Sequence, residues 1–462
     1  MKRPLLLKML VIGFLAMVLV YALSKVQSLV TERSVRQDAV MHEIAATYAG
    51  AQRLWGPVLV LPFTEEILEK TTNNRKTETK LVSYHDSLFF FPSGLKLDGT
   101  LTAGEKHRGL FKALIYDLDA SVDGRFELPA RLPVPERKDR VKLSFQQPYF
   151  SLGIEDPRGL VAAPRLSVGG AVVQFDQGSG LAKFPLGLHA SLPAIAGGNK
   201  IPFKISLRLR GTDQLSVVPL AGEMHAHLRS AWPHPSFGGR FLPAPQDQRV
   251  SASGFEADWN VTALSTSSQR QFANALNNSQ SCGAGECLES FHVRLVEPVN
   301  IYSQSDGAVK YGFLFIWLTF GVFFFFEVLA QLRIHPTQYT FAGAAVTIFF
   351  LLLLSLSEHF QFGIAYSLAA AACVLLLTYY LGHVLGSFRR GSIFGAMLAA
   401  LYGVLYGLLL SEDNALLLGS LLIFALLSIA MIAARRVNWY GLGDGLAQLY
   451  RHDTAVPTKK AT

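Results

Sequence analysis

Ionisable residues inside apolar stretches are the first group whose types and spacing could do chemistry. Glu327 and His383 lie late in two apolar runs, and Glu358 lies at the end of another. Because an ionisable side chain is costly inside a bilayer, such residues often serve ion or substrate pathways. Near the end of a membrane span, however, a side chain can reach the interface without any functional role. The sequence therefore leaves two interpretations open for these three residues, an intramembrane function and simple interfacial placement.

The second group is a Trp-Pro-His-Pro-Ser-Phe run, the most unusual stretch of the polar part of the chain. Two prolines restrict the backbone and exclude a helix, while the Trp and Phe side chains offer large apolar areas. These features predict a rigid corner that fills the core of a β domain. The alternative is a docking surface for membrane helices or for a partner. The residues of this run are Trp232, Pro233, His234, Pro235, Ser236 and Phe237.

Two pairs of residues resemble metal ligands but lack the rest of a site. Cys282 and Cys287 bracket a polar, Gly-rich stretch, and outside the cytoplasm a disulfide between them is the expected state. A metal is the weaker interpretation, because no His or Cys nearby completes four ligands. His225 and His227 would share one face of a strand, yet two ligands are not a site. We therefore expect no metal and no cofactor.

Motifs of known enzyme classes are missing from the sequence. It contains no Gly-x-Ser-x-Gly elbow, no phosphate-binding Gly-Lys-Ser/Thr and no dinucleotide fingerprint in a βαβ setting. These absences favour a protein that is not an enzyme.

The composition indicates which elements must position these residues. Of 462 residues, 50% are hydrophobic and 16% are charged, whereas soluble domains have about 25% charged residues. The segment Ser24–Lys310 has ordinary soluble composition, and Tyr311–Ala434 is almost free of charge. This contrast predicts two structural parts. Although the net charge is +8, many Lys and Arg residues flank apolar runs, so we expect no nucleic-acid binding.

Six apolar runs are long enough for helices that cross a hydrocarbon core of about 30 Å. The first run is longer than the apolar region of a signal peptide and lacks a clear cleavage site, which predicts an uncleaved anchor. In the fifth run, Gly403 and Gly407 have the Gly-x-x-x-Gly spacing that allows a close helix contact. The runs are Leu5–Leu23, Tyr311–Ala330, Thr340–Leu356, Gly363–Leu385, Ile393–Leu410 and Ala415–Ala433.

The short loops between these runs alternate in charge. Arg333, the pair Arg389 and Arg390, and the Arg residues at 435 and 436 fall on the same side as the basic N-terminus. Glu358 and the acidic pair at 412 and 413 fall on the other side. Because Lys and Arg resist translocation, this pattern predicts six spans with both termini in the cytoplasm. The polar domain would then lie outside the cytoplasm.

Periodicity within that polar domain changes from helical to β. Apolar residues recur at three- and four-residue spacings from Val26 to Ile44, which predicts a helical stalk that stops by Gly56-Pro57. Beyond it the period is two, and the alternation from Phe203 to Arg210 is strict. Asn73–Lys76 has the composition of a hairpin tip. We predict strands over Val58–Pro62, Leu88–Pro92, Leu110–Asp119 and Ile201–Gly211, in a sandwich-like β domain.

Together these patterns predict an α+β membrane protein with four successive parts. Residues 1–24 form an N-terminal membrane anchor, and residues 25–310 form an extracytoplasmic β-rich domain with a helical stalk. Residues 311–436 form a bundle of five membrane helices, and residues 437–462 form a cytoplasmic tail.

Several stretches spread along the whole chain resemble the CreD family of bacterial inner-membrane proteins. The Trp-Pro-His-Pro-Ser-Phe run is specific to this resemblance, whereas the membrane stretches alone are weak. The stretches are Arg53–Pro57, Asp156–Leu160, Gly211–Pro219, Trp232–Phe237, Phe241–Pro243, His335–Tyr339, Leu356–His359 and Asn414–Gly419.

The resemblance implies a multi-pass inner-membrane protein of Gram-negative bacteria whose main domain is periplasmic. It also implies expression under a two-component system and roles in envelope integrity, colicin tolerance and β-lactam response. No catalytic residues carry over from the family. We therefore expect a non-enzymatic protein of the envelope stress response whose periplasmic domain binds or senses an envelope component or another envelope protein. The alternatives are a transporter or channel and, third, an enzyme acting on envelope lipid or peptidoglycan.

Overall fold

The computed structural model describes residues 3–73, 76–195, 197–277, 287–297, 301–329, 335–410 and 415–435. The chain divides into two compact units. One unit, here called the helical unit, comprises Met1–Asp38 and Val299–Thr462, and the other, the β unit, comprises Ala39–Pro298. Helix α1 (Arg3–Thr47) contributes residues to both units.

Helix α1 joins the predicted anchor and the predicted stalk into one element of 45 residues. Its sequence has no proline after Pro4 and a single glycine, Gly13, so nothing interrupts the helix. The helix stops before Gly56-Pro57, as predicted, because α1 ends at Thr47. The chain reaches the first strand five residues later, at Gln52.

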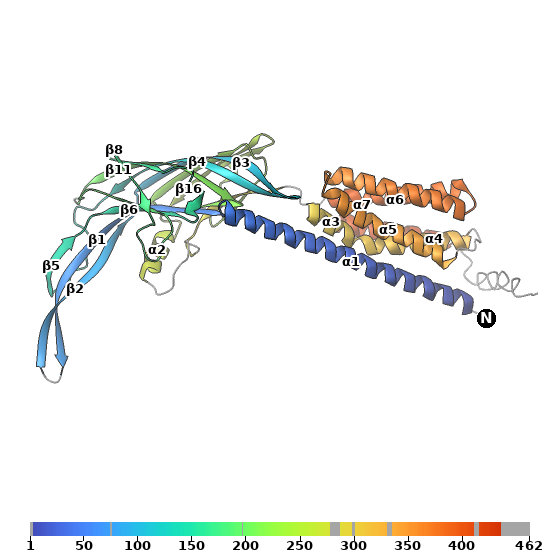
Figure 1. Ribbon diagram of the computed structural model, residues 1–462, viewed down its shortest axis with the longest axis horizontal. Helices are drawn as coiled ribbons and strands as arrows, with labels where there is room; N and C mark the ends of the chain where they lie inside the picture. Colours follow the sequence, from blue (N-terminus) through green and yellow to red (C-terminus); the bar gives the residue numbers. More distant parts are fainter. Residues whose placement is uncertain are drawn as a thin grey trace, which may run out of the picture. The chain divides into compact units, whose positions relative to one another are not determined.

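The β unit contains two sheets, labelled in part in Figure 1, and in both of them most neighbouring strands are antiparallel. The first sheet has the order β14-β17-β12-β1-β6-β10-β9, with β2 and β5 also paired to β1. Its strands are β1 (Gln52–Asn73), β2 (Lys76–Phe90), β5 (Arg140–Phe145), β6 (Tyr149–Ile154), β9 (Asp176–Gln177), β10 (Leu188–Ser191), β12 (Gln214–Val218), β14 (Pro235–Gly239) and β17 (Phe291–Leu295).

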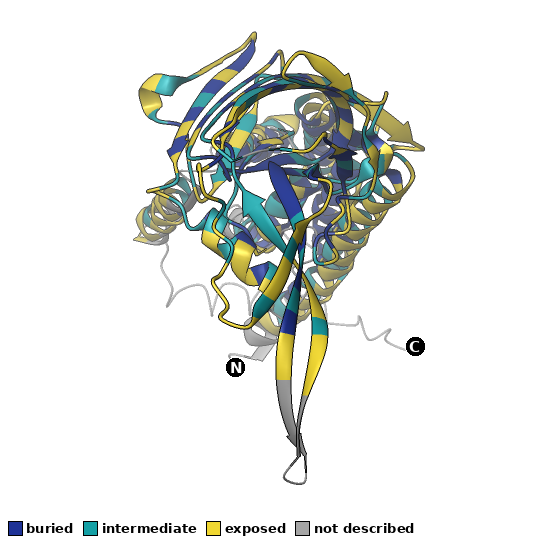
Figure 2. Ribbon diagram, turned by 90° about the vertical axis from the view of Figure 1, so that its left-hand side faces the viewer, coloured by how far each residue is buried: buried dark blue, intermediate teal, exposed yellow. Residues whose placement is uncertain are grey.

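The second sheet has the order β15-β16-β13-β3-β4-β11-β7-β8. Its strands are β3 (Gly94–Arg108), β4 (Phe111–Glu127), β7 (Arg165–Val168), β8 (Ala171–Val173), β11 (Lys200–Thr212), β13 (Glu223–Ser230), β15 (Gln248–Ser251) and β16 (Gly254–Thr262). All four predicted strand segments lie within or overlap strands of the two sheets. Asn73 pairs with Lys76, which confirms the predicted hairpin between β1 and β2, seen as a projecting arm in Figure 2.

One hydrophobic core lies between the two sheets and draws residues from both. Strand β11 shows how the sequence sets this arrangement. From Phe203 to Arg210 its residues alternate strictly between buried and exposed, as predicted, so one face enters the core and the other is polar. Figure 2 shows the same alternation of buried and exposed residues along the strands.

A second, smaller core covers the outer face of the first sheet. Helix α2 (Ser268–Asn277) buries Phe272 there, against Trp55 of β1 and Phe184. The rings of Phe184 and Phe272 stack with centroids 4.8 Å apart. Periodicity alone did not predict α2, because this helix is short and only moderately apolar.

Among the described residues, the helical unit contains a short helix and five longer ones after the β unit. Their bounds are α3 (Ile301–Lys310), α4 (Gly312–Leu329), α5 (Pro336–Ser357), α6 (Phe362–Val384), α7 (Phe388–Leu410) and α8 (Ala415–Arg435). Among the described residues, α5, α6, α7 and the apolar part of α1 are long and apolar enough to cross a membrane. That makes three candidate spans after the β unit where the sequence predicts five. Helices α4 and α8 form where spans are predicted, and their crossing of the membrane belongs to the proposal below.

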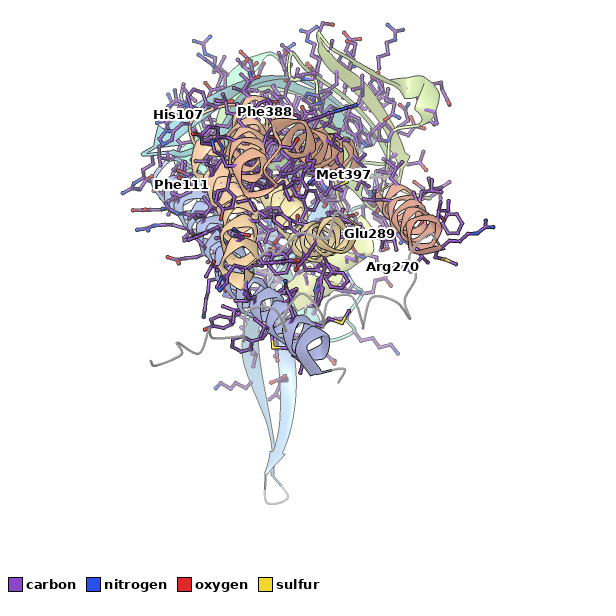
Figure 3. The ribbon with its side chains drawn as sticks, turned by 90° about the vertical axis from the view of Figure 1, so that its right-hand side faces the viewer. His107, Phe111, Arg270, Glu289, Phe388 and Met397 are labelled. Atoms are coloured by element: carbon purple, nitrogen blue, oxygen red, sulfur yellow. The ribbon has the colours of Figure 1, made fainter. Side chains whose placement is uncertain are left out.

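Outward-facing residues of these helices are apolar, as expected for surfaces that meet lipid. Phe388 and Met397 of α7, labelled in Figure 3, are 68% and 39% exposed. A soluble bundle would place polar residues at such positions. The exposed apolar side chains therefore match the membrane assignment of α7.

The close helix contact predicted at Gly403 and Gly407 is wrong. Both residues are exposed, and a Cβ built on either one meets no described atom within 4 Å. The close approach lies earlier in α7, where a Cβ on Gly391 would be 2.6 Å from the backbone nitrogen of Gly382. Gly395 contacts Thr378 in the same way. The sequence contains both Gly-x-x-x-Gly pairs, and spacing alone does not tell which one faces α6.

Candidate functional site

Among the described Asp, Glu, Lys, Arg and His residues of the helical unit, Glu327 is the most buried, and it joins three helices. Its side chain is 6% exposed, and its Oε1 atom forms an ion pair with Lys8 of α1. Its Oε2 atom accepts a hydrogen bond of 2.9 Å from the hydroxyl of Tyr339 on α5. Tyr339 is fully buried. Glu327 therefore has a partner for each carboxylate oxygen, which is the condition for keeping a charge in an apolar interior.

A second polar cluster joins α1 to the helices further along the same side of α1. Arg33 lies 3.6 Å from Glu358, the residue that caps α5, and the hydroxyl of Tyr302 donates to Glu358 at 3.3 Å. Burial, followed by the charge of Glu358, raises the pKa of Tyr302 to about 12. Tyr302 thus stays protonated as the donor at any physiological pH.

Six residues before Arg33, nearly two helical turns, Gln27 donates to Asp306 of α3, which also pairs with Lys310 at 2.7 Å. Gln27 follows Lys8 by 19 residues, so the two polar contacts lie about 28 Å apart along α1. This distance matches a hydrocarbon core of about 30 Å. Each end of the apolar stretch of α1 is therefore held by polar contacts to the other helices of its unit.

Within the β unit, three of the family-like stretches meet where α1 ends. The carboxylate of Asp156 accepts hydrogen bonds from the backbone N–H of Gly50 at 2.9 Å and from Arg158 Nη2 at 2.6 Å. Arg158 in turn donates to the carbonyl of Ala46 in the last turn of α1. The Arg158 hydrogen bond is the main cause that holds the pKa of Asp156 below its usual range.

The side chain of Gln52 completes this junction. Its Nε2 atom donates to the carbonyls of Asp156, at 3.0 Å, and Arg210, at 2.8 Å. Thr212 donates through its hydroxyl to the carbonyl of Ala49 at 3.1 Å. These contacts join residues within or directly beside the stretches that begin at Arg53, Asp156 and Gly211, and Arg53 also pairs with Ser216 in the first sheet. The three stretches therefore lie close together where the chain passes from helix to sheet.

Comparison with known proteins decides the family. The family described as inner membrane protein CreD matches residues 4–440. The chain belongs to the CreD family. It is 31% identical to the inner membrane protein CreD of Escherichia coli (strain K12) over 441 residues, which is 95% of each chain. This CreD-family chain is therefore an inner-membrane protein with several candidate spans, and the family suggested by the sequence stretches is confirmed.

A structural comparison adds no argument about fold or function. The CreD-family chain matches an M1 zinc metallopeptidase from Deinococcus radiodurans at 8% identity and a TM-score of 0.20. The match covers 44% of this chain and 42% of that chain.

The Trp232–Phe237 run of this CreD-family chain lies against the core between the two sheets. Trp232 is partly buried, and its indole Nε1 donates to the carbonyl of Val296 at 3.0 Å. Phe237 meets the rings of Phe255 and Trp259 edge-on, with both centroid distances at 5.6 Å. Pro235 and Ser236 pair with β17 as part of β14, and Pro233 and His234 form the turn before it. These are the contacts that a rigid corner would make.

His383 occupies a different environment from Glu327. It is exposed in the last turn of α6, and its ring lies 4.7 Å from that of Tyr379, centroid to centroid. Its Nδ1 atom is 3.1 Å from the carbonyl of Tyr379, one turn earlier. Its contacts with described residues are therefore local to α6, as expected for a histidine near the end of a span.

The paired cysteines and histidines have different outcomes. Cys282 lies outside the described residues, so its predicted disulfide with Cys287 stays a prediction. His225 and His227 do share one face of β13, and their Nδ1 atoms lie 2.7 Å from Asn260 and 2.9 Å from Asp258. Among the described residues, no group of three or more His, Cys, Asp or Glu side chains could hold a metal ion.

The partners of Glu327 and Glu358 are contacts that sequence reasoning missed. In the sequence Lys8 has the position of a charge that flanks a membrane span. The residues around it give no indication of a contact with Glu327, 319 positions away. Glu65 of β1 was also missed, although it is 3% exposed and pairs with Arg140 and, at 3.4 Å, with Arg137. Its only sequence signal is a position on the buried face of a long alternating strand.

Proposed function

We propose that this CreD-family chain is a non-enzymatic protein of envelope integrity that crosses the inner membrane six times. Both termini lie in the cytoplasm, and the β unit lies in the periplasm. There the β unit binds or senses an envelope component or another envelope protein. The protein uses no cofactor and no nucleic acid.

The observation that carries this proposal is the two-ended attachment of α1. Lys8 and Glu327 hold one end of the apolar stretch, and Gln27 with Asp306 and Arg33 with Glu358 hold the other. The spacing of about 28 Å fits one crossing of the bilayer. Since the β unit follows the Arg33 end of α1, it belongs on the side opposite the N-terminus.

Loop charges support the same orientation. Arg389 and Arg390 open α7, at the side assigned to the cytoplasm, while Glu358 closes α5 at the side assigned to the periplasm. Basic residues are retained in the cytoplasm during insertion, and acidic residues contribute little. Crossings by α4 and α8 are required for this alternation to hold at every loop.

Reporter fusions test the topology. We expect periplasmic signal after Ala103, Glu358 and Asp413, and cytoplasmic signal after Arg333, Arg390 and the C-terminus. Cytoplasmic signal after Ala103 would overturn the placement of the β unit and every periplasmic role with it.

The transporter or channel alternative depends on Glu327, and one double variant distinguishes it from the role of Glu327 as an anchor for α1. If Glu327 anchors α1, the double variant Lys8→Met and Glu327→Gln keeps an uncharged contact between the two helices. This variant should then complement the envelope-sensitivity phenotype of a deletion strain as the parent does. If Glu327 carries an ion or proton, the same variant fails to complement at a normal protein level. The enzyme alternative predicts that single conservative changes within one polar cluster of the β unit abolish complementation.

A further inference from the structure

A groove of about 640 Å³ with charged residues on its rim lies on the second sheet, where β13, β3 and β4 run side by side. Its rim includes Glu223 of β13, Lys96 of β3 and Arg125 of β4, all exposed. His225 and Asn260 close one side. The groove belongs entirely to the β unit, and of its lining residues only His225 and Asn260 form a contact described above.

Gly94 creates the hollow. In the sheet register Gly94 lies between Glu223 on one neighbouring strand and Arg125 on the other. Residues directly opposite one another point to the same face, so a side chain at position 94 would stand between the carboxylate and the guanidinium. A Cβ built on Gly94 meets no described atom within 4 Å, and its φ is not positive. The gap is therefore open space that a larger residue could fill.

The charges around this gap are of both signs and only partly compensated. Neither Glu223 nor Lys96 forms a salt bridge with another described residue. Arg125 contacts Glu127 on its own strand at 3.1 Å, with 64% of its side chain exposed. His225 is held by Asn260 at 2.7 Å. Asp123 of β4 also lines the groove, lies opposite Lys96 in the register and pairs with Lys204 at 3.3 Å. The Glu223 carboxylate on β13 and the Arg125 guanidinium on β4 therefore complement a ligand that carries an amino group and a carboxylate.

The spacing sets the length of such a ligand. Glu223 and Arg125 are two strands apart, which is about 9.6 Å at the usual distance between neighbouring strands. Three extended residues span about 10 Å. The lining contains no Phe, Tyr or Trp, the side chains with the largest aromatic faces.

We propose that this groove binds a short extended peptide of about three residues with free termini. The peptide's ammonium group lies at Glu223, its backbone crosses Gly94, and its carboxylate lies at Arg125. This inference deepens the proposed function, because a periplasmic β unit would meet peptide fragments of the envelope. It names the class of component that the β unit recognises.

Calorimetry on the purified full chain in detergent tests the groove, with trialanine as the probe. We expect saturable binding that weakens at least tenfold when trialanine is replaced by its N-acetyl form or by its C-terminal amide. Glu223→Gln should weaken binding of trialanine to a similar degree, and Gly94→Leu should abolish it. Glu256→Gln, an exposed acid on β16, is the matched control and should bind as the parent does.

Absence of heat at millimolar trialanine, or binding that is indifferent to the blocked termini or to Glu223→Gln, would overturn the proposal. If Gly94→Leu fails to fold, the binding of trialanine to Glu223→Gln and the binding of the N-acetyl and amide forms to the parent still test the proposal. The outcome is separable from the topology test, since purified protein exposes the groove in any orientation. A cytoplasmic signal after Ala103 would overturn the proposed function while leaving the measured binding intact.

Discussion

The hydroxyl of Tyr339 donates to Glu327 at 2.9 Å, and the other carboxylate oxygen of Glu327 pairs with Lys8. Three helices, α1, α4 and α5, are therefore joined through one buried carboxylate. Because both of its oxygens have partners, we interpret this carboxylate as a structural anchor. In the sequence alone, an ionisable residue inside an apolar run is typical of an ion pathway.

Breaking this pair from one side should cost more than removing it. Lys8→Met leaves the Glu327 charge buried without its cation, and we expect a loss of about 3–5 kcal/mol in the free energy of unfolding. Adding Glu327→Gln should recover most of that loss, because the amide can still accept from Tyr339. Thermal unfolding of the detergent-solubilised protein measures both variants. A double variant as unstable as Lys8→Met would contradict the anchor.

The two glycine pairs of α7 offer a matched comparison in one helix. Gly391→Leu forces a side chain against the backbone of Gly382, and we expect a loss of about 1–3 kcal/mol or more. Gly403→Leu places the same side chain in open space, and we expect no loss. Thermal unfolding of the two variants in the same detergent checks this. Equal stability would show that the α6–α7 contact does not depend on Gly391.

How far the sequence predicted the fold depends on whether the signal was local. The alternation from Phe203 to Arg210 fixed both the strand and its buried face, because burial has a period of two in a half-buried strand. The absence of helix breakers between Gly13 and Thr47 likewise allowed a single helix. The helical stalk predicted directly after the anchor is confirmed, since both lie in α1.

The candidate site was predicted only as isolated residues. Glu327, Glu358 and the Trp232–Phe237 run stood out because their residue types are unusual for their surroundings. Lys8 and Arg33 did not, because their partners come from elements hundreds of positions away. The junction at Asp156 was visible as three separate stretches, and only the fold shows that they meet.

Asp156 should make stability at that junction depend on pH. Its pKa in the folded state lies below the value of about 3.9 expected in an unfolded chain, so its contribution is fully present above that value. The contribution declines as the pH falls through the lower, folded-state pKa. Asp156→Asn should therefore cost about 1–3 kcal/mol at pH 7, since charge-assisted hydrogen bonds are lost.

Thermal unfolding of the parent and Asp156→Asn between neutral pH and about pH 3 follows this difference. We expect the gap between the two to narrow as the pH falls below 4. Asp119→Asn, an exposed acid on β4, should stay within about 0.5 kcal/mol of the parent throughout. A gap that is constant with pH would mean that the carboxylate charge does not stabilise the junction.

The role of the Trp232–Phe237 run, rigid corner or docking surface, can be decided by comparing the stability of variants with their ability to complement a deletion strain. Trp232→Ala removes the indole from the core edge together with its hydrogen bond to Val296, and we expect a loss of about 1–3 kcal/mol. Trp232→Phe keeps most of the apolar contact and should lose about 1 kcal/mol, mainly from the carbonyl left without its donor. The stability of the full chain and complementation of the deletion strain are measured in parallel. Complementation that falls in proportion to stability supports a rigid corner, because the run then acts only through the fold. A Trp232→Ala protein that is as stable as the parent yet fails to complement would instead establish a docking surface.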